Sequence, residues 1–215
     1  MTNKPLCRRK TVTALVVGLT LLVACSTTTF TSTWRSSNAQ AINPVGKSIA
    51  AVFLTNEESL RRSGEDALAR AISARGARGF GTYLLLPSAQ HPDAEAAEAR
   101  LRAAGANAVV TMRVVGSDQR ITYTPGPGWV GPAPYRGFGP YWGYGWGMAS
   151  QPGTLRTDTL VSVETLVHSL PADRPSELLW ASTSRTTNPR NINALVREVA
   201  DATANEMVRQ GFLAR

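Results

Sequence analysis

The 215-residue sequence predicts an α/β (α+β) fold in which a mixed sheet of five or six strands packs against two or three helices. Apolar runs at 48–54, 81–86 and 107–115 are typical of strands buried on both faces. Helical periodicity separates these runs, and the alternation favours parallel strands joined by crossover helices. Two later segments, 157–168 and 177–187, predict a hairpin. The balance of 43% apolar and 18% charged residues excludes long disorder and collagen-like sequence.

Residues 1–24 have the features of a secretory signal. A basic start without acids precedes an apolar run at 11–24 that ends on Ala24. The basic residues are Lys4, Arg8, Arg9 and Lys10. A run of this length is shorter than the roughly 20 residues that a transmembrane helix needs. We therefore expect cleavage after Ala24 rather than a permanent membrane span.

The end of this segment, Leu22-Val23-Ala24-Cys25, resembles the lipobox of bacterial lipoproteins. The resemblance implies diacylglycerol on Cys25, cleavage before it and acylation of the new amino terminus. Two or more acyl chains anchor a protein stably in a membrane. By resemblance to enterobacterial sorting, Ser26 implies the periplasmic face of the outer membrane. The alternative is a plain secretory signal in which Cys25 is accidental.

Cleavage halves the basic excess of the chain. Residues 1–24 hold four of the 23 basic residues and none of the 15 acidic ones, so their removal lowers the net charge from +8 to +4. The remaining basic residues are dispersed, which indicates solvated surfaces and no nucleic-acid partner. Cys7 leaves with the signal and Cys25 carries lipid, so no thiol remains for a disulfide, a metal site or a nucleophile.

The mature chain is expected to consist of a tether at 25–47 and a single domain at 48–215. Within the tether, 28–35 alternates as a short strand, which would place its larger side chains on one face. These are Phe30, Ser32 and Trp34.

Two helices are predicted between the first strands. Thr55 and Glu58 fit a capping box, and Gly76 would end the helix. Its inward positions are Leu60, Leu68, Ala71 and Ile72. Pro92 at the first helical position opens an Ala-rich helix that Gly105 closes.

The strand at 107–115 is expected to continue over 119–124 past a bulge at Gly116. In the hairpin, the apolar face of 157–168 carries Val161, Val163 and Val167. A final helix would start at Asn188-Pro189 and end at Gly211. Its inward stripe would consist of Ile192, Leu195, Val196, Val199 and Met207.

The insert at 125–153 is the most unusual segment. It contains nine of the 18 glycines, six of the 13 prolines and seven of the 15 aromatic residues. This composition opposes regular structure, and a connection of this length is usually functional or disordered. Residues 126–131 match GxGxxG by letter, but the interleaved prolines prevent the helix that a dinucleotide site requires.

The aromatic residues of the insert form the candidate contact surface. They are Trp129, Tyr135, Phe138, Tyr141, Trp142, Tyr144 and Trp146. Exposed rings of this kind stack on sugars, lie at a lipid headgroup interface or anchor a protein partner. The alternative is a loop that folds onto its own body to hide its rings.

No catalytic constellation is recognisable, so we expect no enzyme, cofactor or metal site. His91 and His168 have no local carboxylate partner. Asp158 and Glu164 share a strand face but lie about 20 Å apart at roughly 3.3 Å per residue. The remaining acids are expected to cap or solvate helices. They include Glu57, Glu58, Glu65 and Asp66.

The layout resembles small bacterial envelope lipoproteins that contain a domain of unknown function. The distinctive features are the lipobox, the glycine- and aromatic-rich run at 141–147, and Leu179-Trp180 on the second hairpin arm. Leu179 stands where Val is common, and the insert starts with more prolines than usual. The resemblance implies location and fold, with no activity to inherit.

We therefore predict a non-catalytic binding or structural role at the outer membrane, with an envelope protein or glycan as partner. An envelope hydrolase or glycan-modifying enzyme that uses the insert as a sugar platform is the alternative.

Overall fold

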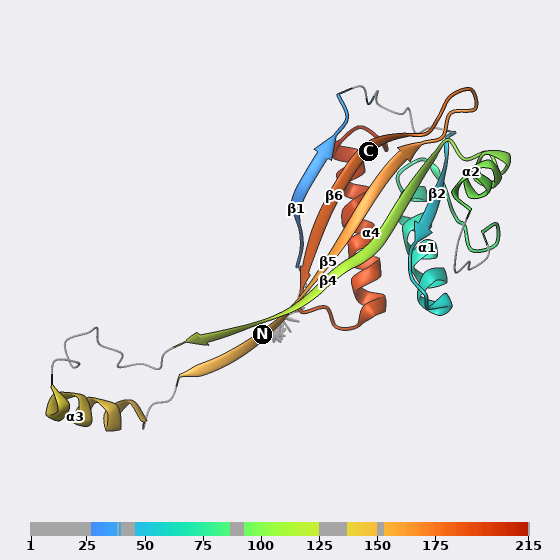
Figure 1. The fold of residues 1–215 in the computed structure, drawn as a ribbon. Helices are drawn as coiled ribbons and strands as arrows, with labels where there is room; N and C mark the ends of the chain where they lie inside the picture. Colours follow the sequence, from blue (N-terminus) through green and yellow to red (C-terminus); the bar gives the residue numbers. More distant parts are fainter. Residues whose placement is uncertain are drawn as a thin grey trace, which may run out of the picture.

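The computed structural model describes residues 27–37, 39, 46–86, 93–124, 137–149 and 153–214. Within them, six strands form one mixed sheet in the order β1-β6-β5-β4-β2-β3 (Figure 1). The strands are β1 (Thr27–Arg35), β2 (Ser48–Phe53), β3 (Arg78–Gly81), β4 (Ala108–Thr124), β5 (Thr154–Ser169) and β6 (Glu177–Thr187). The helices are α1 (Glu58–Ser73), α2 (Ala94–Ala103), α3 (Phe138–Ala149) and α4 (Ile192–Arg209). The predicted fold class is confirmed.

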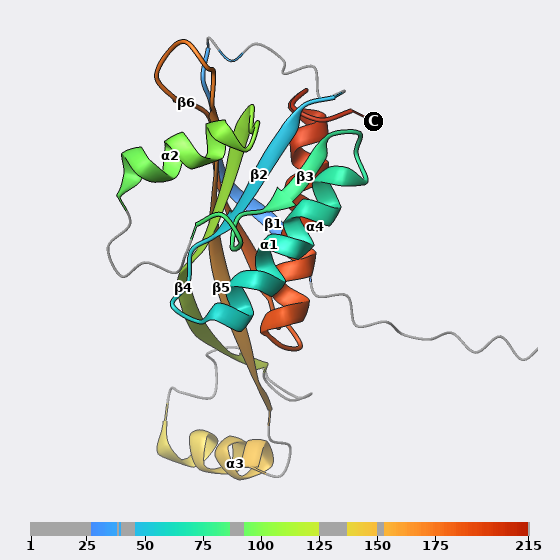
Figure 2. The ribbon, with the colours of Figure 1, turned by 90° about the vertical axis from the view of Figure 1, so that its right-hand side faces the viewer.

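Helices cover both faces of the sheet. Figure 2 shows the sheet edge-on, with α2 on one side and the pair α1 and α4 on the other. Because successive strand residues point to opposite faces, Ile49 and Ala51 of β2 enter the larger core under α1 and α4. Ala50, between them, packs in a smaller core with Leu101 of α2. β2 is thus covered on both faces, as its apolar run predicts.

The predicted crossovers are present. β2 pairs in parallel with β3 on one side and with β4 on the other, so α1 and α2 each connect parallel strands. Gly76 and Gly105 follow these helices with φ of 84° and 80°, the left-handed conformation that glycine adopts without strain.

The predicted starts of α1 and α2 need correction. The N-cap of α1 is Glu57 and its side chain makes no cap hydrogen bond, so the capping box of Thr55 and Glu58 is wrong. Glu58 instead accepts a hydrogen bond from Arg62 Nε at 2.7 Å. In α2, Asp93 is the N-cap and accepts hydrogen bonds from the amides of Glu95 and Ala96. Pro92 therefore precedes the N-cap and is not the first helical residue; it lies outside the described residues.

The predicted strand at 81–86 is wrong. β3 ends at Gly81, and the next five residues form turns in which the Leu85 and Leu86 amides donate to the Thr82 carbonyl at 2.9 and 2.8 Å. The amides of Thr82 and Tyr83 donate to the carboxylate of Glu65 on α1. With their amides held by this carboxylate and by the turn, these residues cannot continue the strand.

β1 forms where expected but does not place its large side chains on one face. The register to β6 shifts between Phe30 and Ser32, which identifies a bulge at Thr31. Phe30 consequently faces the core and its ring contacts Trp180 edge-on, with the centroids 6.2 Å apart. Ser32 and Trp34 lie on the opposite face, where Trp34 is 51% exposed.

The hairpin of β5 and β6 follows the prediction closely. Val161, Val163 and Val167 are buried, and Trp180 of β6 is fully buried among them. The predicted start of the last helix at Asn188-Pro189 is wrong, because the N-cap of α4 is Asn191 and the helix begins at Ile192. Ile192, the first position of the predicted stripe, is exposed and does not face the core. The other stripe residues are buried, and Gly211 ends the helix region with φ of 78°.

β4 and β5 are much longer than the other strands. They remain paired from Ala108 with Ser169 to Thr124 with Thr154, and the predicted bulge at Gly116 is present as a register shift between Val114 and Gly116. Among the described residues, no helix combines the length and apolar composition that crossing a bilayer requires.

Candidate functional site

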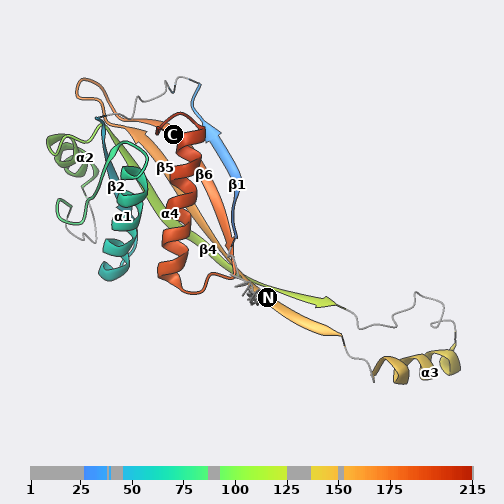
Figure 3. The ribbon, with the colours of Figure 1, turned by 180° about the vertical axis from the view of Figure 1, so that it is seen from behind.

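The ends of β4 and β5 leave the sheet as a two-stranded arm. We use this name for β4 from Gln119, α3 and β5 as far as Thr159. β5 pairs with β6 only from Leu160 onward, and β4 pairs with β2 only up to Met112, so no other described strand pairs with the two strands of the arm. Figures 1 and 3 show the arm projecting from the body with α3 at its far end.

One face of the arm ribbon is apolar and exposed. It carries Ile121, Tyr123 and Leu155, whose exposed fractions lie between 56% and 73%. Tyr123 and Leu155 are direct cross-strand partners. A Cβ on Gly153, just before β5, would lie 2.4 Å from the Thr124 carbonyl oxygen and 2.5 Å from the Tyr123 ring, so the close approach at this end of the ribbon requires glycine.

The other ribbon face is polar. It carries Arg120, Thr122, Arg156 and Asp158, two residues from each strand. Asp158 accepts hydrogen bonds from Asn188 Nδ2 at 2.6 Å and from Arg156 Nε at 2.8 Å. These two hydrogen bonds lower the pKa of the Asp158 carboxyl below its ordinary value. The ribbon is therefore amphipathic: one face is apolar, and the other carries the ion pair of Arg156 and Asp158.

The helix at the tip carries an aromatic stripe. Phe138, Trp142 and Trp146 follow one another at four-residue spacing, so they line one side of α3. Neighbouring rings touch, with centroids 5.5 Å apart for Phe138 and Trp142 and 5.8 Å apart for Trp142 and Trp146. All three side chains are exposed, with fractions between 56% and 78%. α3 contains no charged residue.

α3 contradicts the expectation that the whole insert opposes regular structure. Pro140 is the third residue of the helix, within the first turn, where the missing amide has no intrahelical acceptor. The glycines at 139, 143, 145 and 147 lower helix propensity by up to about 1 kcal/mol each relative to alanine. A twelve-residue helix of this composition is marginally stable alone in water. An additional contact would be needed to stabilise it.

The structure brings only part of the predicted contact surface together. Phe138, Trp142 and Trp146 form the stripe, and Tyr144 is half-buried. Trp129 and Tyr135 lie outside the described residues, as do Ala24, Cys25 and the side chain of Tyr141.

Sequence reasoning missed the apolar ribbon face. The alternation of Ile121 and Tyr123 with polar neighbours was the available signal. The predicted strand at 119–124 continues a core strand, whereas in the structure this part of β4 lies beyond the helices that cover the sheet. The apolar side of the ribbon is consequently exposed.

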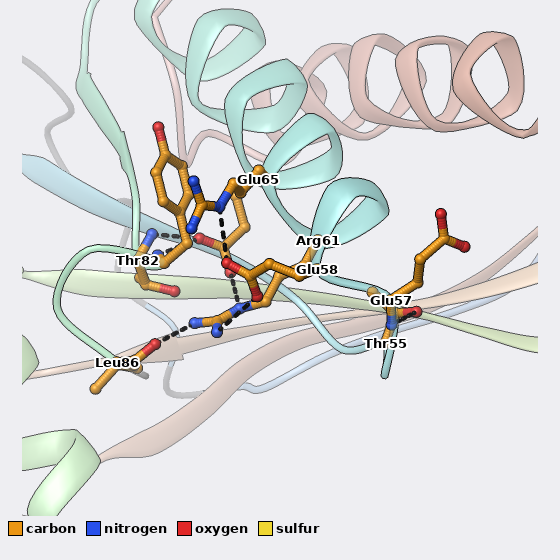
Figure 4. A network of polar contacts seen from close by, with 9 residues as sticks. Thr55, Glu57, Glu58, Arg61, Glu65, Thr82 and Leu86 are labelled. Carbon is orange, nitrogen blue, oxygen red and sulfur yellow. Dashed lines mark hydrogen bonds and ion pairs between the residues drawn. The ribbon is translucent and has the colours of Figure 1, made fainter. Parts of the chain in front are cut away.

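The most extensive buried polar network is structural. Glu65, expected to solvate α1, is fully buried and accepts hydrogen bonds from Arg61 Nε at 3.1 Å, the Thr82 amide at 2.5 Å and the Tyr83 amide at 2.7 Å (Figure 4). Arg61 also donates to the Leu86 carbonyl at 2.5 Å. All these partners belong to α1 and to the turn after β3. The network therefore fastens this turn to the helix.

The acids considered for catalysis, Asp158 and Glu164, are hydrogen-bonded within the fold, and the structure does not bring His168 together with them. Glu164 accepts a hydrogen bond from Arg113 Nε at 2.7 Å, and Asp158 is held as described above. His168 is partly buried near the end of β5, and burial lowers the pKa of its imidazole. His91 lies outside the described residues. Within the described part of the chain, no three His, Cys, Asp or Glu side chains are grouped as metal ligands would be.

No family model matches the chain, and no curated protein matches it in sequence. Two crystal structures of PelC dodecamers from Paraburkholderia phytofirmans are similar to it in structure. One is a single-residue variant, with 15% identity over 89% of this chain and 100% of its own length and a TM-score of 0.44. The other has 13% identity over 86% of this chain and 98% of its own length, also with a TM-score of 0.44. At these values the similarity carries no functional conclusion for this chain.

Proposed function

We propose that this chain is a lipoprotein on the periplasmic face of the outer membrane, that its role is non-catalytic binding or structural support in the envelope, and that the arm is its contact surface. The observation that carries the proposal is the exposed, uncharged aromatic stripe of Phe138, Trp142 and Trp146 at the end of the arm. Adjacent exposed rings on a projecting element are typical of contact sites.

The anchor rests on the sequence around Cys25. The basic start, the apolar run and the lipobox at 22–25 occur in the order that lipid attachment requires. Ser26 in the following position favours the outer membrane by the sorting resemblance described above.

A non-catalytic role is supported by the way the acids are used. Asp158, Glu164 and Glu65 each accept hydrogen bonds from cationic or amide donors within the fold. A general base must have a lone pair directed at a substrate. These carboxylates instead stabilise the arm base, the sheet surface and the α1 turn.

Metabolic labelling with an alkyne fatty acid tests the anchor. The wild-type chain should be labelled and sediment with membranes, whereas Cys25→Ala should be unlabelled. Cys7→Ala is the matched control, because Cys7 is the only other cysteine in the chain and should be dispensable for labelling. An unlabelled wild type, or a labelled Cys25→Ala, would overturn the anchor.

Separation of the two membranes tests the location. In a host with Asp-dependent sorting, wild-type protein should fractionate with the outer membrane. Ser26→Asp should move it to the inner membrane without altering the label. Wild-type protein found in the inner membrane would contradict the proposed location.

A further inference from the structure

This inference rests on the proposed lipid anchor and concerns what the arm contacts. β1 begins at Thr27, only two residues after Cys25. Because consecutive Cα atoms are about 3.8 Å apart, the Cα atoms of Cys25 and Thr27 can be separated by no more than about 7.6 Å. A lipid on Cys25 would therefore hold the start of β1 at the membrane surface, even though 25–47 is long enough in sequence to serve as a tether.

The start of β1 lies at the base of the arm. Thr27 pairs with Thr187, the last residue of β6, and Thr187 pairs with Leu160 of β5. Adjacent strands are about 4.8 Å apart, so Thr27 is within roughly 10 Å of the point where the arm leaves the sheet. In Figures 1 and 3, the arm and the strands of the body extend from this point in opposite directions.

A lipid on Cys25 would consequently hold the base of the arm close to the membrane. From Gln119 paired with Thr159 to Thr124 paired with Thr154 the arm contains six residue pairs, or about 20 Å of ribbon. With a bilayer held close to Thr27, the whole ribbon and α3 lie within reach of the membrane surface and its headgroup region.

The side chains of the arm suit that position. Tryptophan and tyrosine concentrate at the headgroup level of membranes, and α3 presents Trp142 and Trp146 without any charged residue on the helix. The ribbon adds an apolar face with Ile121 and Leu155 opposite a face with paired charges. Contact with a bilayer also supplies the stabilisation that a glycine-rich twelve-residue helix lacks in water.

We propose that the arm binds the phospholipid bilayer that holds the lipidated Cys25. α3 and the apolar ribbon face occupy the headgroup region and form a second, non-covalent membrane contact. The lipid alone would leave the body free to rotate about its amino terminus. Two contacts about 20 Å apart fix its orientation, with the opposite end of the sheet directed away from the membrane.

The test uses the chain from residue 25 with Cys25→Ser, which carries no lipid, and vesicles of phosphatidylethanolamine and phosphatidylglycerol. This protein should float with the vesicles, and brominated acyl chains should quench its tryptophan fluorescence. Trp142→Ala with Trp146→Ala should weaken vesicle binding at least about tenfold and remove most of the quenching. Both side chains are exposed, so circular dichroism should show an intact fold.

Trp34→Ala is the matched control. Trp34 is also an exposed tryptophan, but it pairs with Ala181 in the middle of β6, six residues or about 20 Å along the strand from Thr187 at the arm base. Its removal should leave vesicle affinity unchanged. Equal binding by the Cys25→Ser protein with and without the two arm substitutions would overturn the proposal, and so would an absence of vesicle binding by the Cys25→Ser protein with an intact arm.

Two other binding partners of the arm would give different results in this experiment. If the stripe binds a second copy of the chain, sedimentation should show a dimer that the double variant abolishes, without vesicle binding. If it binds glycan, soluble cell-wall fragments should compete with the vesicles. Either result would overturn the bilayer proposal. Because the protein in this test has no lipid, neither result bears on the fatty-acid labelling of Cys25, so the two proposals fail separately.

Discussion

Thr28 of β1 donates a hydrogen bond from Oγ1 to Glu198 Oε1 of α4 at 2.8 Å, across 170 positions of sequence. The same hydroxyl lies 2.7 Å from Thr186 Oγ1 of β6. The edge strand is thus attached both to its neighbouring strand and to the helix layer within three residues of Cys25. The beginning of the described chain belongs to the body of the fold.

Thr28→Val should reduce the free energy of unfolding by about 1 kcal/mol, because the two hydroxyl contacts are lost while the side-chain volume is kept. Denaturant titration measures this loss, and hydrogen exchange should show faster opening of β1. Thr31→Val is the control, since Thr31 is exposed at the bulge and donates only to the Thr183 carbonyl at 3.1 Å. An equal effect of both substitutions would contradict a special role for Thr28.

Glu65→Gln should destabilise the fold by about 3 kcal/mol. The amide replaces one acceptor oxygen with a donor facing backbone amides or Arg61, and it leaves that buried guanidinium with only the more distant Glu58, 3.7 Å away, as a counter-charge. Urea denaturation gives the value. Arg62→Gln breaks an exposed pair with Glu58 on the same helix and should leave the urea midpoint nearly unchanged. A comparably small loss for Glu65→Gln would show that the network is dispensable.

Two glycine substitutions should have opposite effects. A Cβ on Gly79 would lie 2.2 Å from the Ala69 carbonyl oxygen of α1, so Gly79→Ala should cost about 2 to 3 kcal/mol in global stability. A Cβ on Gly143 meets nothing within 4 Å, so Gly143→Ala should stabilise α3 by up to about 1 kcal/mol. Thermal unfolding reports the first effect and far-ultraviolet circular dichroism the second. A loss of helicity in Gly143→Ala would contradict the finding that a Cβ at this position of α3 meets no other atom within 4 Å.

His168 should make stability dependent on pH. Burial lowers the pKa of its imidazole, and Glu98 opposes this shift only in part. The unfolded chain, with an ordinary pKa near 6.5, therefore takes up the proton first as pH falls. The stability present above about pH 6.5 should decrease as pH falls through the lower folded pKa.

His168→Gln should reduce the change in melting temperature between pH 5 and pH 7. His91→Gln removes the only other histidine of the chain and controls for the loss of an imidazole. An unchanged profile in His168→Gln would show that another group is responsible.

The predictable part of the fold is the part in which local pattern and tertiary environment agree. β2 has a continuous apolar run because both of its faces are covered, and β5 alternates because Val161 and Val163 face the core. The turns after Gly76 and Gly105 require a positive φ, which the sequence indicates through glycine itself.

The errors occur where distant groups override a local pattern. Residues 82–86 are apolar enough for a strand, but Glu65, 17 positions earlier, accepts the amide hydrogen of Thr82. One extra residue at Thr31 rotates Trp34 away from Phe30, and nothing in the alternation of β1 shows that bulge. α3 forms in a segment whose glycines and prolines favour turns, and its aromatic stripe becomes visible only once helical spacing is imposed.

The pairing of β1 with β6 has a consequence for assembly during secretion. In the proposed secretion of this chain, β1 would be the first strand to emerge from the translocation channel, but its partner β6 ends at Thr187, 160 positions after Thr27. Until that late segment emerges, the amino-terminal strand has no neighbour and the cysteine before it is accessible to the modifying enzymes. Once β1 has paired with β6, only Ser26 separates Cys25 from the folded sheet. Lipid attachment and cleavage are therefore expected to precede completion of the sheet, so the order of these events follows from the topology.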